Sequence, residues 1–247
     1  MTSDAWIRRF NPAPDAPTRL VCLPHAGGAA SYYLSFAKAL GTTTDLVSIQ
    51  YPGRQDRRME PVVASVPELA DQLVDVIAPL ADRPLTLFGH SMGASVAFEL
   101  ARRLEATGNG PAAVFVSARR APSLNVDDGV HLLDDAGLIA EVKKLGGLGS
   151  DLLDDPDIQQ MVLPAIRGDY TAAETYRVAP DVTVACPITA LCGDTDPKVA
   201  IDEAQLWRGH TTGRFELKVF AGDHFYIDDN SAAIMNLVRA HLATLTR

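Results

Sequence analysis

The chain has 247 residues, of which 47% are hydrophobic, and a formal net charge of −9. This length supplies one large hydrophobic core and is too short for two ordinary catalytic domains with a linker. Nucleic acid and anionic membranes both need a basic surface that replaces counterions, so the acidic charge excludes a general binder of either. We therefore expect a single domain over residues 1–247, with no nucleic-acid or membrane partner.

The three cysteines, Cys22, Cys186 and Cys192, lie in or beside apolar runs and have no CxxC spacing. They predict buried, reduced thiols and neither a disulfide framework nor a zinc site. Residues 1–10 contain no apolar stretch of signal-peptide length, and no run of 18 apolar residues occurs along the chain. Both observations favour a cytoplasmic protein.

Short apolar runs alternate along the chain with segments of helical period. This alternation predicts a mostly parallel central sheet with helices on both faces, and near-continuous hydrophobicity is typical of strands buried on both faces. The expected strands are residues 19–23, 46–50, 85–88, 113–117, 188–192 and 215–220. The expected helices are residues 32–40, 66–80, 92–105, 201–209 and 231–244.

One stretch interrupts the alternation, because residues 119–182 hold far more chain than a single crossover helix needs. Within it, residues 132–145 and 158–170 have amphipathic helical patterns, separated by a glycine-rich breaker at residues 146–149. Long insertions in compact enzymes tend to be functional. We therefore expect an inserted helical lid over a substrate site, with a helical layer that only packs on the body as the alternative.

A glycine-flanked serine follows the third expected strand. Gly89, Ser91 and Gly93 form the pattern G-x-S-x-G between an apolar run and a helical pattern, which is the context of a nucleophile elbow. The turn is so sharp that side chains at the flanking positions would collide with neighbouring backbone. The pattern predicts an α/β-hydrolase fold, with Ser91 as a nucleophile at the carboxyl edge of its sheet.

A serine nucleophile requires a base, and in this fold an acid and then a histidine follow the serine along the chain. Among the later histidines, only His224 directly follows an expected strand, with Gly222 supplying the turn. His224 is therefore the expected general base. The others lie in the insertion or in helical segments and are expected to be surface or packing residues: His131, His210 and His241.

Two carboxylates, Asp194 and Asp196, follow the fifth expected strand, and either could serve as the acid. Pro197 gives the loop after Asp196 an extended start. An acid one step beyond the turn at Gly193 is better aimed at a histidine on the neighbouring strand. We therefore favour Asp196 and keep Asp194 as the alternative.

The oxyanion that forms at an attacked carbonyl needs two backbone N–H donors. One belongs to the residue after the nucleophile, Met92. The second is expected from the glycine-rich loop at residues 24–28, where Ala26 is the candidate donor. This loop completes neither GxGxxG nor GxxxxGK[ST], so it does not indicate a phosphate site. A tight turn without a catalytic role is the remaining alternative.

Five motifs together resemble those of the type II thioesterases, which are stand-alone editing enzymes of polyketide synthases and nonribosomal peptide synthetases. The motifs are LPHAGG at residues 23–28, YPGR at 51–54, GHSMGA at 89–94, GDTDP at 193–197 and GDHF at 222–225. The resemblance extends from about residue 6 to residue 243 and is weakest across the insertion.

The resemblance implies a triad of Ser91, Asp196 and His224, with the amides of Ala26 and Met92 in the oxyanion hole. It also implies the substrate, an acyl group thioesterified to the phosphopantetheine arm of an acyl or peptidyl carrier protein, or a small acyl thioester. The expected reaction proceeds through an acyl-serine that water hydrolyses. It needs no metal and no other cofactor.

Basic residues are expected where a carrier protein docks. Carrier proteins are acidic, as the family association implies, and a protein of net charge −9 would repel them unless positive charge gathers at the docking face. The candidates are Arg54, in a cluster with Arg57 and Arg58, and the pair Arg119 and Arg120 at the start of the insertion. The alternatives are solvated surface arginines and, for Arg54, a structural role under the loop.

Two other functions share these motifs. Carboxylesterases and lipases hydrolyse oxygen esters with the same triad, since a fold does not fix its substrate. A non-catalytic binding protein on the same scaffold is the second rival, and the complete set of triad and oxyanion motifs argues against it.

Overall fold

A computed structural model of the chain describes residues 5–124, 126, 128–146 and 150–246. Strands in these ranges form one sheet in the order β1-β3-β2-β4-β5-β6-β7. The short strand β1 (Ile7–Arg8) pairs antiparallel with β3, and the pairings among the other six strands are parallel. The fold is therefore the mostly parallel α/β-hydrolase architecture that the sequence predicts.

The six parallel strands begin and end within two residues of their expected positions. Their bounds are β2 (Arg19–Leu23), β3 (Asp45–Ile49), β4 (Leu85–His90), β5 (Ala113–Ser117), β6 (Ile188–Gly193) and β7 (Phe215–Phe220). Every residue of β2 to β5 is buried, as near-continuous hydrophobicity predicts. Strand β1 is half-buried and only two residues long, so it gives no periodic signal.

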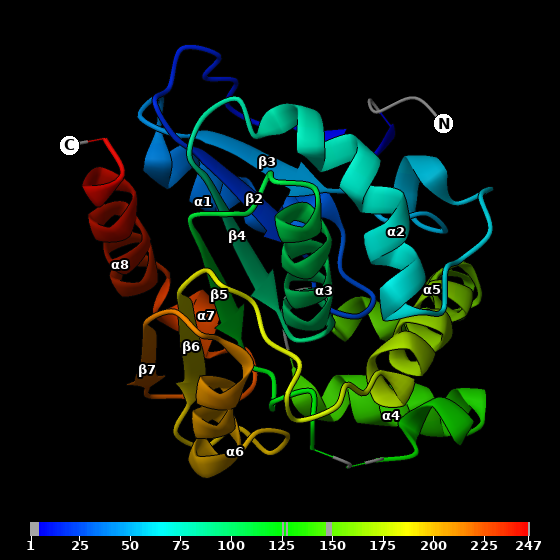
Figure 1. The fold of residues 1–247 in the computed structure, drawn as a ribbon. Helices are drawn as coiled ribbons and strands as arrows, with labels where there is room; N and C mark the ends of the chain where they lie inside the picture. The colour runs from blue at the N-terminus through cyan, green and yellow to red at the C-terminus, as the bar shows by residue number, and fades with distance from the viewer. Residues whose placement is uncertain (1–4, 125, 127, 147–149, 247) are drawn as a thin grey trace.

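Helices cover both faces of the sheet (Figure 1). One core layer joins the sheet to α2 (Val66–Ile77) and α3 (Met92–Ala106), and a second joins it to α1 (Leu34–Leu40) and α8 (Ser231–Thr244). Two short helices, α6 (Ile201–Gln205) and α7 (Tyr226–Asp229), follow β6 and β7. The 3-10 turns of the body are η2 (Ala30–Tyr33), η3 (Gln55–Arg57), η4 (Ala78–Leu80) and η7 (Leu206–His210).

The described residues of the long connection between β5 and β6 contain four helical segments. They are η5 (Val130–Leu132), α4 (Asp135–Leu145), η6 (Ser150–Asp154) and α5 (Pro156–Thr175). Figure 1 shows α4 and α5 together on the side toward which the arrows of β4 and β5 point. This is the carboxyl edge of the sheet, where ligands of open α/β folds bind.

The two inserted helices begin at aspartates that cap them. The Asp134 carboxylate accepts the Gly137 amide, so α4 begins three residues later than expected. Asp155 caps α5, which continues to Thr175 and is longer than the expected segment 158–170. Of the predicted glycine breaker, Gly146 ends α4 with φ +76°, and residues 147–149 lie outside the described residues.

The three cysteines are buried and carry no disulfide, as predicted. Among the helices of the described ranges, none combines the length and apolar character that crossing a bilayer requires.

The turn that carries Ser91 leaves no room for side chains on its flanks. A Cβ atom on Gly93 would lie 2.1 Å from the Leu23 carbonyl oxygen, and one on Gly89 would lie 2.1 Å from the carbonyl oxygen of Gly93. Both obstacles are backbone atoms, which cannot move aside as a flexible side chain can. The two glycines therefore allow β2, β4 and α3 to approach closely at the site.

We expect Gly93→Ala to lower the free energy of unfolding by about 3 kcal/mol, the upper end of overpacking effects, because the added methyl group meets the backbone of β2. The matched control is Gly209→Ala, where a Cβ meets nothing within 4 Å, and where we expect a change of less than about 1 kcal/mol. Urea unfolding measures both. Equal stabilities of the two variants would contradict this account of the turn.

Candidate active site

Ser91 lies between β4 and α3 in a strained backbone conformation. Its φ and ψ are 53° and −118°, a region that side-chain-bearing residues rarely adopt. The Ser91 amide donates to the Ser117 carbonyl at 2.8 Å, which fixes the turn against β5. The strain and this hydrogen bond hold the hydroxyl at the carboxyl edge of the sheet.

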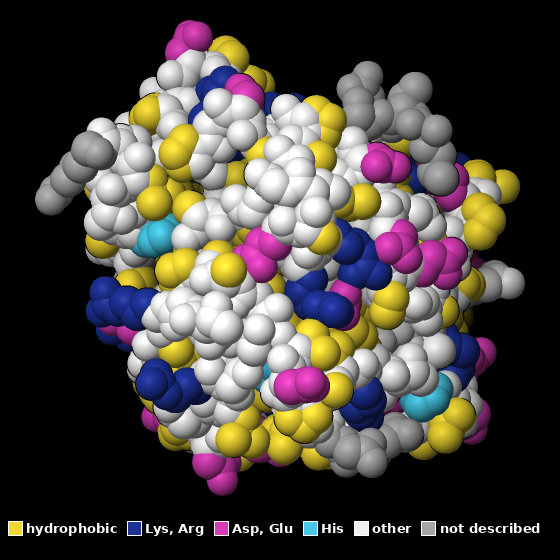
Figure 2. Space-filling model, in the orientation of Figure 1, with side chains coloured by type: hydrophobic (Ala, Val, Ile, Leu, Met, Phe, Trp, Pro, Cys, Tyr) yellow, Lys and Arg dark blue, Asp and Glu magenta, His cyan; other side chains and the backbone are white. Residues whose placement is uncertain are grey.

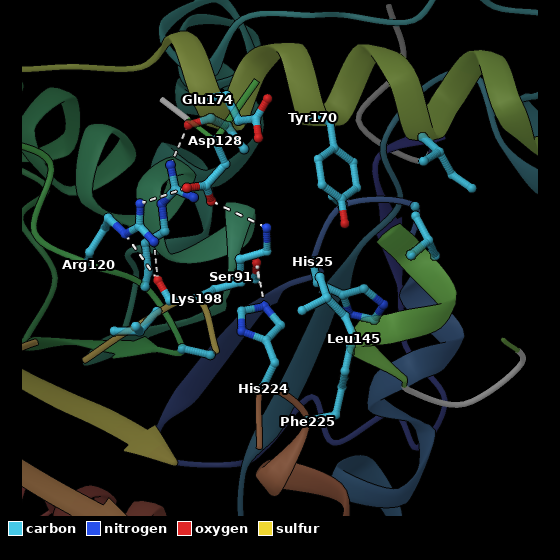
Figure 3. A pocket seen from close by; sticks show the side chains of 18 of the residues that line it. His25, Ser91, Arg120, Asp128, Leu145, Tyr170, Glu174, Lys198, His224 and Phe225 are labelled. Carbon is cyan, nitrogen blue, oxygen red and sulfur yellow. Dashed lines mark hydrogen bonds and ion pairs between the residues drawn. The ribbon is translucent and has the colours of Figure 1, made fainter. Parts of the chain in front are cut away.

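Three side chains from separate loops form a continuous chain of hydrogen bonds. The Ser91 Oγ lies 3.0 Å from His224 Nε2, and His224 Nδ1 lies 3.0 and 2.9 Å from the two carboxylate oxygens of Asp196. Figure 3 shows Ser91 and His224 pointing toward each other. His224 is buried, and the side chain of Asp196 is fully covered. A base oriented by a carboxylate in this way can accept the proton of the serine hydroxyl.

The two carboxylates after β6 have different partners. Asp196 also accepts the Lys198 amide at 2.8 Å, which directs its carboxylate toward His224. Asp194 instead accepts the Gly222 amide at 2.9 Å and so supports the loop that carries the histidine. Of the two acids that the sequence leaves open, Asp196 is therefore the one in contact with the imidazole.

The other late histidines make packing contacts away from Ser91. His131 Nδ1 lies 2.5 Å from the Glu174 carboxylate, and His210 bonds through its two nitrogens to the Val182 carbonyl and the Ser123 hydroxyl. His241 bonds to the Thr86 hydroxyl at 3.1 Å. The structure thus brings only His224 of this group to the serine.

Two backbone amides are available near the serine. Met92 is the first residue of α3, so its N–H has no acceptor within the helix. Ala26 lies in the turn of residues 25–28, called the oxyanion loop below, and its N–H has no acceptor among the described residues. Ala26 and Ser91 line the same cavity. The two amides that the sequence nominates are thus unpaired donors at this site.

A cavity of about 450 Å³ lies between Ser91 and the inserted segment. Its far wall is made mainly of apolar side chains from α4, η6 and α5: Val142, Leu145, Leu153, Ile158, Val162 and Ile166. Charged side chains line another part of the cavity: Arg119, Arg120, Asp128, Glu174 and Lys198 (Figure 3). An apolar cavity with a few charged groups beside a candidate nucleophile can hold a ligand that has one apolar and one polar end.

Of the three candidate docking arginines, one is buried and two line the cavity. Arg54 is only 7% exposed and is bound to Asp169, which corrects the expectation that it lies at the entrance and matches its alternative structural role. Arg119 and Arg120 both line the cavity. Arg119 donates to the Ser95 hydroxyl at 3.1 Å, and Arg120 donates to the Lys198 carbonyl at 3.1 Å.

Two further histidines surround the His224 imidazole. His90 is fully buried and bonds to the Ser117 hydroxyl at 2.9 Å. Burial first, and then the nearby His224 and His25, hold the pKa of His90 well below 6.5. Burial, followed by His224 and Arg54, lowers the pKa of His25 to about 3. Both rings are therefore neutral near pH 7 and place no permanent positive charge beside the catalytic candidate.

A known protein family matches most of the chain. The family model of the thioesterase domain matches residues 18–242. The chain belongs to the thioesterase family. It is accordingly a hydrolase that acts on thioester bonds. Within the described residues, no group of three or more metal-ligating side chains occurs that could hold an ion.

Two relatives of this thioesterase are named after biosynthesis. The chain is 50% identical to thioesterase PikA5 of Streptomyces venezuelae over 97% of its own length and 86% of PikA5. It is 48% identical to a probable cadicidin biosynthesis thioesterase of Streptomyces griseus, over 94% of its own length and 64% of that protein. The solved type II thioesterase BorB of the borrelidin cluster is 49% identical, with a TM-score of 0.91 over 98% of this chain and 99% of BorB. These similarities confirm the resemblance to type II thioesterases.

One site residue, Asp169, has no counterpart in the sequence prediction. It is completely buried on α5, and its neighbours on the same helical face are the apolar Ile166, Ala172 and Ala173. A carboxylate within an apolar stripe was the available signal, because a buried charge requires a partner. The partner, Arg54, lies 115 residues away, which sequence spacing does not reveal.

We expect the stability of the wild-type protein to fall as the pH drops below 6.5. The unfolded chain binds a proton on His90 near that pH, whereas burial keeps the folded pKa of His90 well below it. The free energy of unfolding should therefore lose up to about 1.4 kcal/mol per pH unit from this group. Replacing His90→Asn should flatten the slope by that amount between about pH 6.5 and 5, as measured by urea unfolding at several pH values. An unchanged slope would contradict the prediction.

Proposed function

We propose that this thioesterase hydrolyses acyl groups from the phosphopantetheine arm of acyl or peptidyl carrier proteins in polyketide or nonribosomal peptide biosynthesis. The observation that carries the proposal is the hydrogen-bonded chain from Ser91 through His224 to Asp196 at the edge of an apolar cavity. The names of the cadicidin biosynthesis thioesterase and of BorB support the biosynthetic setting. Removal of acyl groups that stall an assembly line is the editing role that this class of enzyme performs.

In the first half of the reaction, the Ser91 Oγ attacks the thioester carbonyl while His224 Nε2 accepts the hydroxyl proton. Asp196 orients the imidazole and stabilises the imidazolium that forms. The tetrahedral intermediate then collapses, the carbon–sulfur bond breaks, and His224 returns the proton to the departing pantetheine sulfur. The products of this half are an acyl-serine and a free thiol.

The negative charge that develops on the carbonyl oxygen needs donors in place before the reaction. We assign this role to the amides of Ala26 and Met92, both of which are unpaired in the described structure. Loss of one such donor typically costs about 2.7–4 kcal/mol of transition-state stabilisation. The position of the oxyanion loop should therefore matter nearly as much as the triad.

In the second half, a water molecule replaces the thiol. His224 accepts a proton from that water while its oxygen attacks the acyl-serine carbonyl, and the same two amides hold the second oxyanion. Collapse of this intermediate breaks the bond to Ser91 Oγ, which recovers its proton from His224. The carboxylic acid leaves, and no metal or redox cofactor takes part.

The inserted segment, residues 119–182, is proposed as the lid of this site. Apolar side chains of α4 and α5 face the cavity and suit an acyl chain, whereas the charged side chains around Lys198 suit the amide-rich pantetheine arm. The depth of the apolar part should limit the acyl groups that are accepted. We place the enzyme in the cytoplasm, where the free thiols of Cys22, Cys186 and Cys192 remain reduced.

Carrier docking is proposed at Arg119 and Arg120. Figure 2 shows basic and acidic side chains intermixed over the face that it draws. At the cavity, Arg120 is 3.5 Å from Asp128 and 3.7 Å from Glu203, so its charge is partly balanced. A local contact with a few acidic groups of the carrier therefore suits this surface better than broad electrostatic attraction.

For the triad, we expect Asp196→Asn to reduce kcat by about 10⁴-fold, because the imidazole loses the partner that selects its tautomer. The matched control is Asp194→Asn in the same loop, whose side-chain oxygen can still accept the Gly222 amide, and which should retain activity within about 10-fold of the wild type. Ser91→Ala sets the background. The measurement is the release of free thiol from an acylated carrier protein. Similar losses in both aspartate variants would contradict the assignment of the acid.

For the substrate, we expect a higher kcat/KM for acyl carrier proteins than for the same acyl group on coenzyme A or in a p-nitrophenyl ester. Arg120→Glu should lower kcat/KM for the carrier substrate by about 10-fold and leave the small thioesters nearly unchanged. Arg208→Glu, on an exposed site of η7, is the control. Equal losses on all substrates would exclude docking at Arg120. A preference for the oxygen ester would favour a carboxylesterase.

A further inference from the structure

The oxyanion loop is held by a buried ion pair, of which the sequence motifs contain Arg54 but not its partner Asp169. Asp169 of α5 accepts the Gly27 amide at 2.7 Å and two bonds from the Arg54 guanidinium at 2.5 and 2.8 Å. Arg54 in turn donates to the Gly28 carbonyl at 3.1 Å. One carboxylate from the inserted segment thus fixes the loop both directly and through Arg54.

Two backbone groups next to the Ala26 amide, the His25 carbonyl and the Gly27 N–H, have fixed partners. The Gly28 N–H donates to the His25 carbonyl at 3.0 Å and closes the turn. In a trans peptide the N–H points away from the preceding carbonyl, so fixing the His25 oxygen also sets the direction of the Ala26 N–H. Asp169 fixes the following peptide plane through the Gly27 N–H. The Ala26 N–H remains as the free donor of the turn.

The same face of α5 also meets the loop sterically. A Cβ atom on Gly27, which has φ +75°, would lie 3.0 Å from the Ile166 side chain. Ile166 and Asp169 are three residues apart and therefore neighbours on one helical face. Tyr170, the next residue, points from α5 into the cavity toward His25 (Figure 3). The loop is therefore enclosed by one apolar and one charged contact from a single helix turn.

The charge of the pair is maintained in the interior. Burial alone would lower the pKa of Arg54, but the charge and hydrogen bonds of Asp169 outweigh it and raise the pKa above its usual value. Asp169 is 0% exposed and Arg54 is 7% exposed. A buried pair with this geometry fixes the orientation of the groups bonded to it. It adds less to the free energy of unfolding, since desolvation offsets much of the attraction.

We propose that Asp169 is a positioning residue for the oxyanion hole, so that the Ala26 amide has its working orientation only when α5 of the inserted segment is packed on the loop. The inference rests on the proposed function of Ser91 and the oxyanion loop. Asp169 acts through Arg54 and the Gly27 backbone and does not contact the substrate. The packing of the lid therefore determines the orientation of the Ala26 amide, the donor to the transition state.

The test compares two disruptions of the pair with a control on the same helix. Asp169→Ala removes the carboxylate, and Asp169→Leu combined with Arg54→Met replaces the pair by apolar side chains, which often restores stability. The control, Arg167→Ala, removes an ion pair with Asp135 inside the inserted segment and leaves the loop contacts intact. Melting temperature, kcat, KM and the affinities of two ligands are measured for each.

The two ligands separate the ground state from the transition state. An alkyl boronic acid forms a tetrahedral adduct on Ser91 with one oxygen in the oxyanion hole, whereas an uncleavable alkyl-pantetheine thioether has no carbonyl next to sulfur and does not use the hole. We expect Asp169→Ala to reduce kcat and boronate affinity together by about 10²-fold, with KM and thioether affinity within about threefold of the wild type. The apolar pair should recover the melting temperature without recovering kcat. For the control, kcat, KM and the affinities of both ligands should remain within about threefold of the wild-type values.

Three results would overturn the inference: recovery of kcat along with melting temperature in the apolar pair, a loss confined to KM, or an equal loss in Arg167→Ala. If Asp169→Ala does not fold, the double variant with the apolar pair tests the inference by itself. Failure of the proposed function would look different, because the wild type would then hydrolyse small thioesters without acting on carrier-bound acyl groups. Boronate affinity would still report on the loop in that case, since the adduct needs only Ser91 and the hole.

Discussion

The parallel pairing of β2, β4, β5, β6 and β7 is the constraint on which the site depends. Parallel strands deliver all their following loops to one edge, and here those loops carry the residues that we propose as oxyanion donor, nucleophile, acid and base. The glycines around Ser91 let the backbones approach closely enough for these loops to meet. Once the strand order is set, the distances near 3 Å between the three side chains require only local turns.

Much of this arrangement follows from local patterns in the sequence. The strands are predictable because burial on both faces makes them continuously apolar, and the order of serine, acid and histidine along the chain then selects His224. The choice between Asp194 and Asp196 is already less secure, because both follow the same strand. It depends on which carboxylate accepts the Lys198 amide and which accepts the Gly222 amide, and those hydrogen bonds form only in the fold.

The insertion is where local patterns carry least information. Its helices are recognisable by period, but the contacts that hold them join residues that are more than 50 positions apart. Asp169 meets Arg54, Tyr176 donates to the Glu99 carboxylate at 2.8 Å, and Arg119 donates to the Ala173 carbonyl. All three contacts fix α5 or the residue that follows it. The clearest way to find them in advance is to ask which buried charges still lack a partner.

Strand β7 forms one border of the sheet, since its single neighbour is β6. A bare border presents unpaired backbone groups to which a second copy of the chain could add its own strand. Here Glu216 and Lys218 occupy alternate positions of β7 and are partly exposed, so their charges point from the same face of the strand. Charged side chains at such a border disfavour the addition of a further strand, since the pairing would remove part of their charge from water.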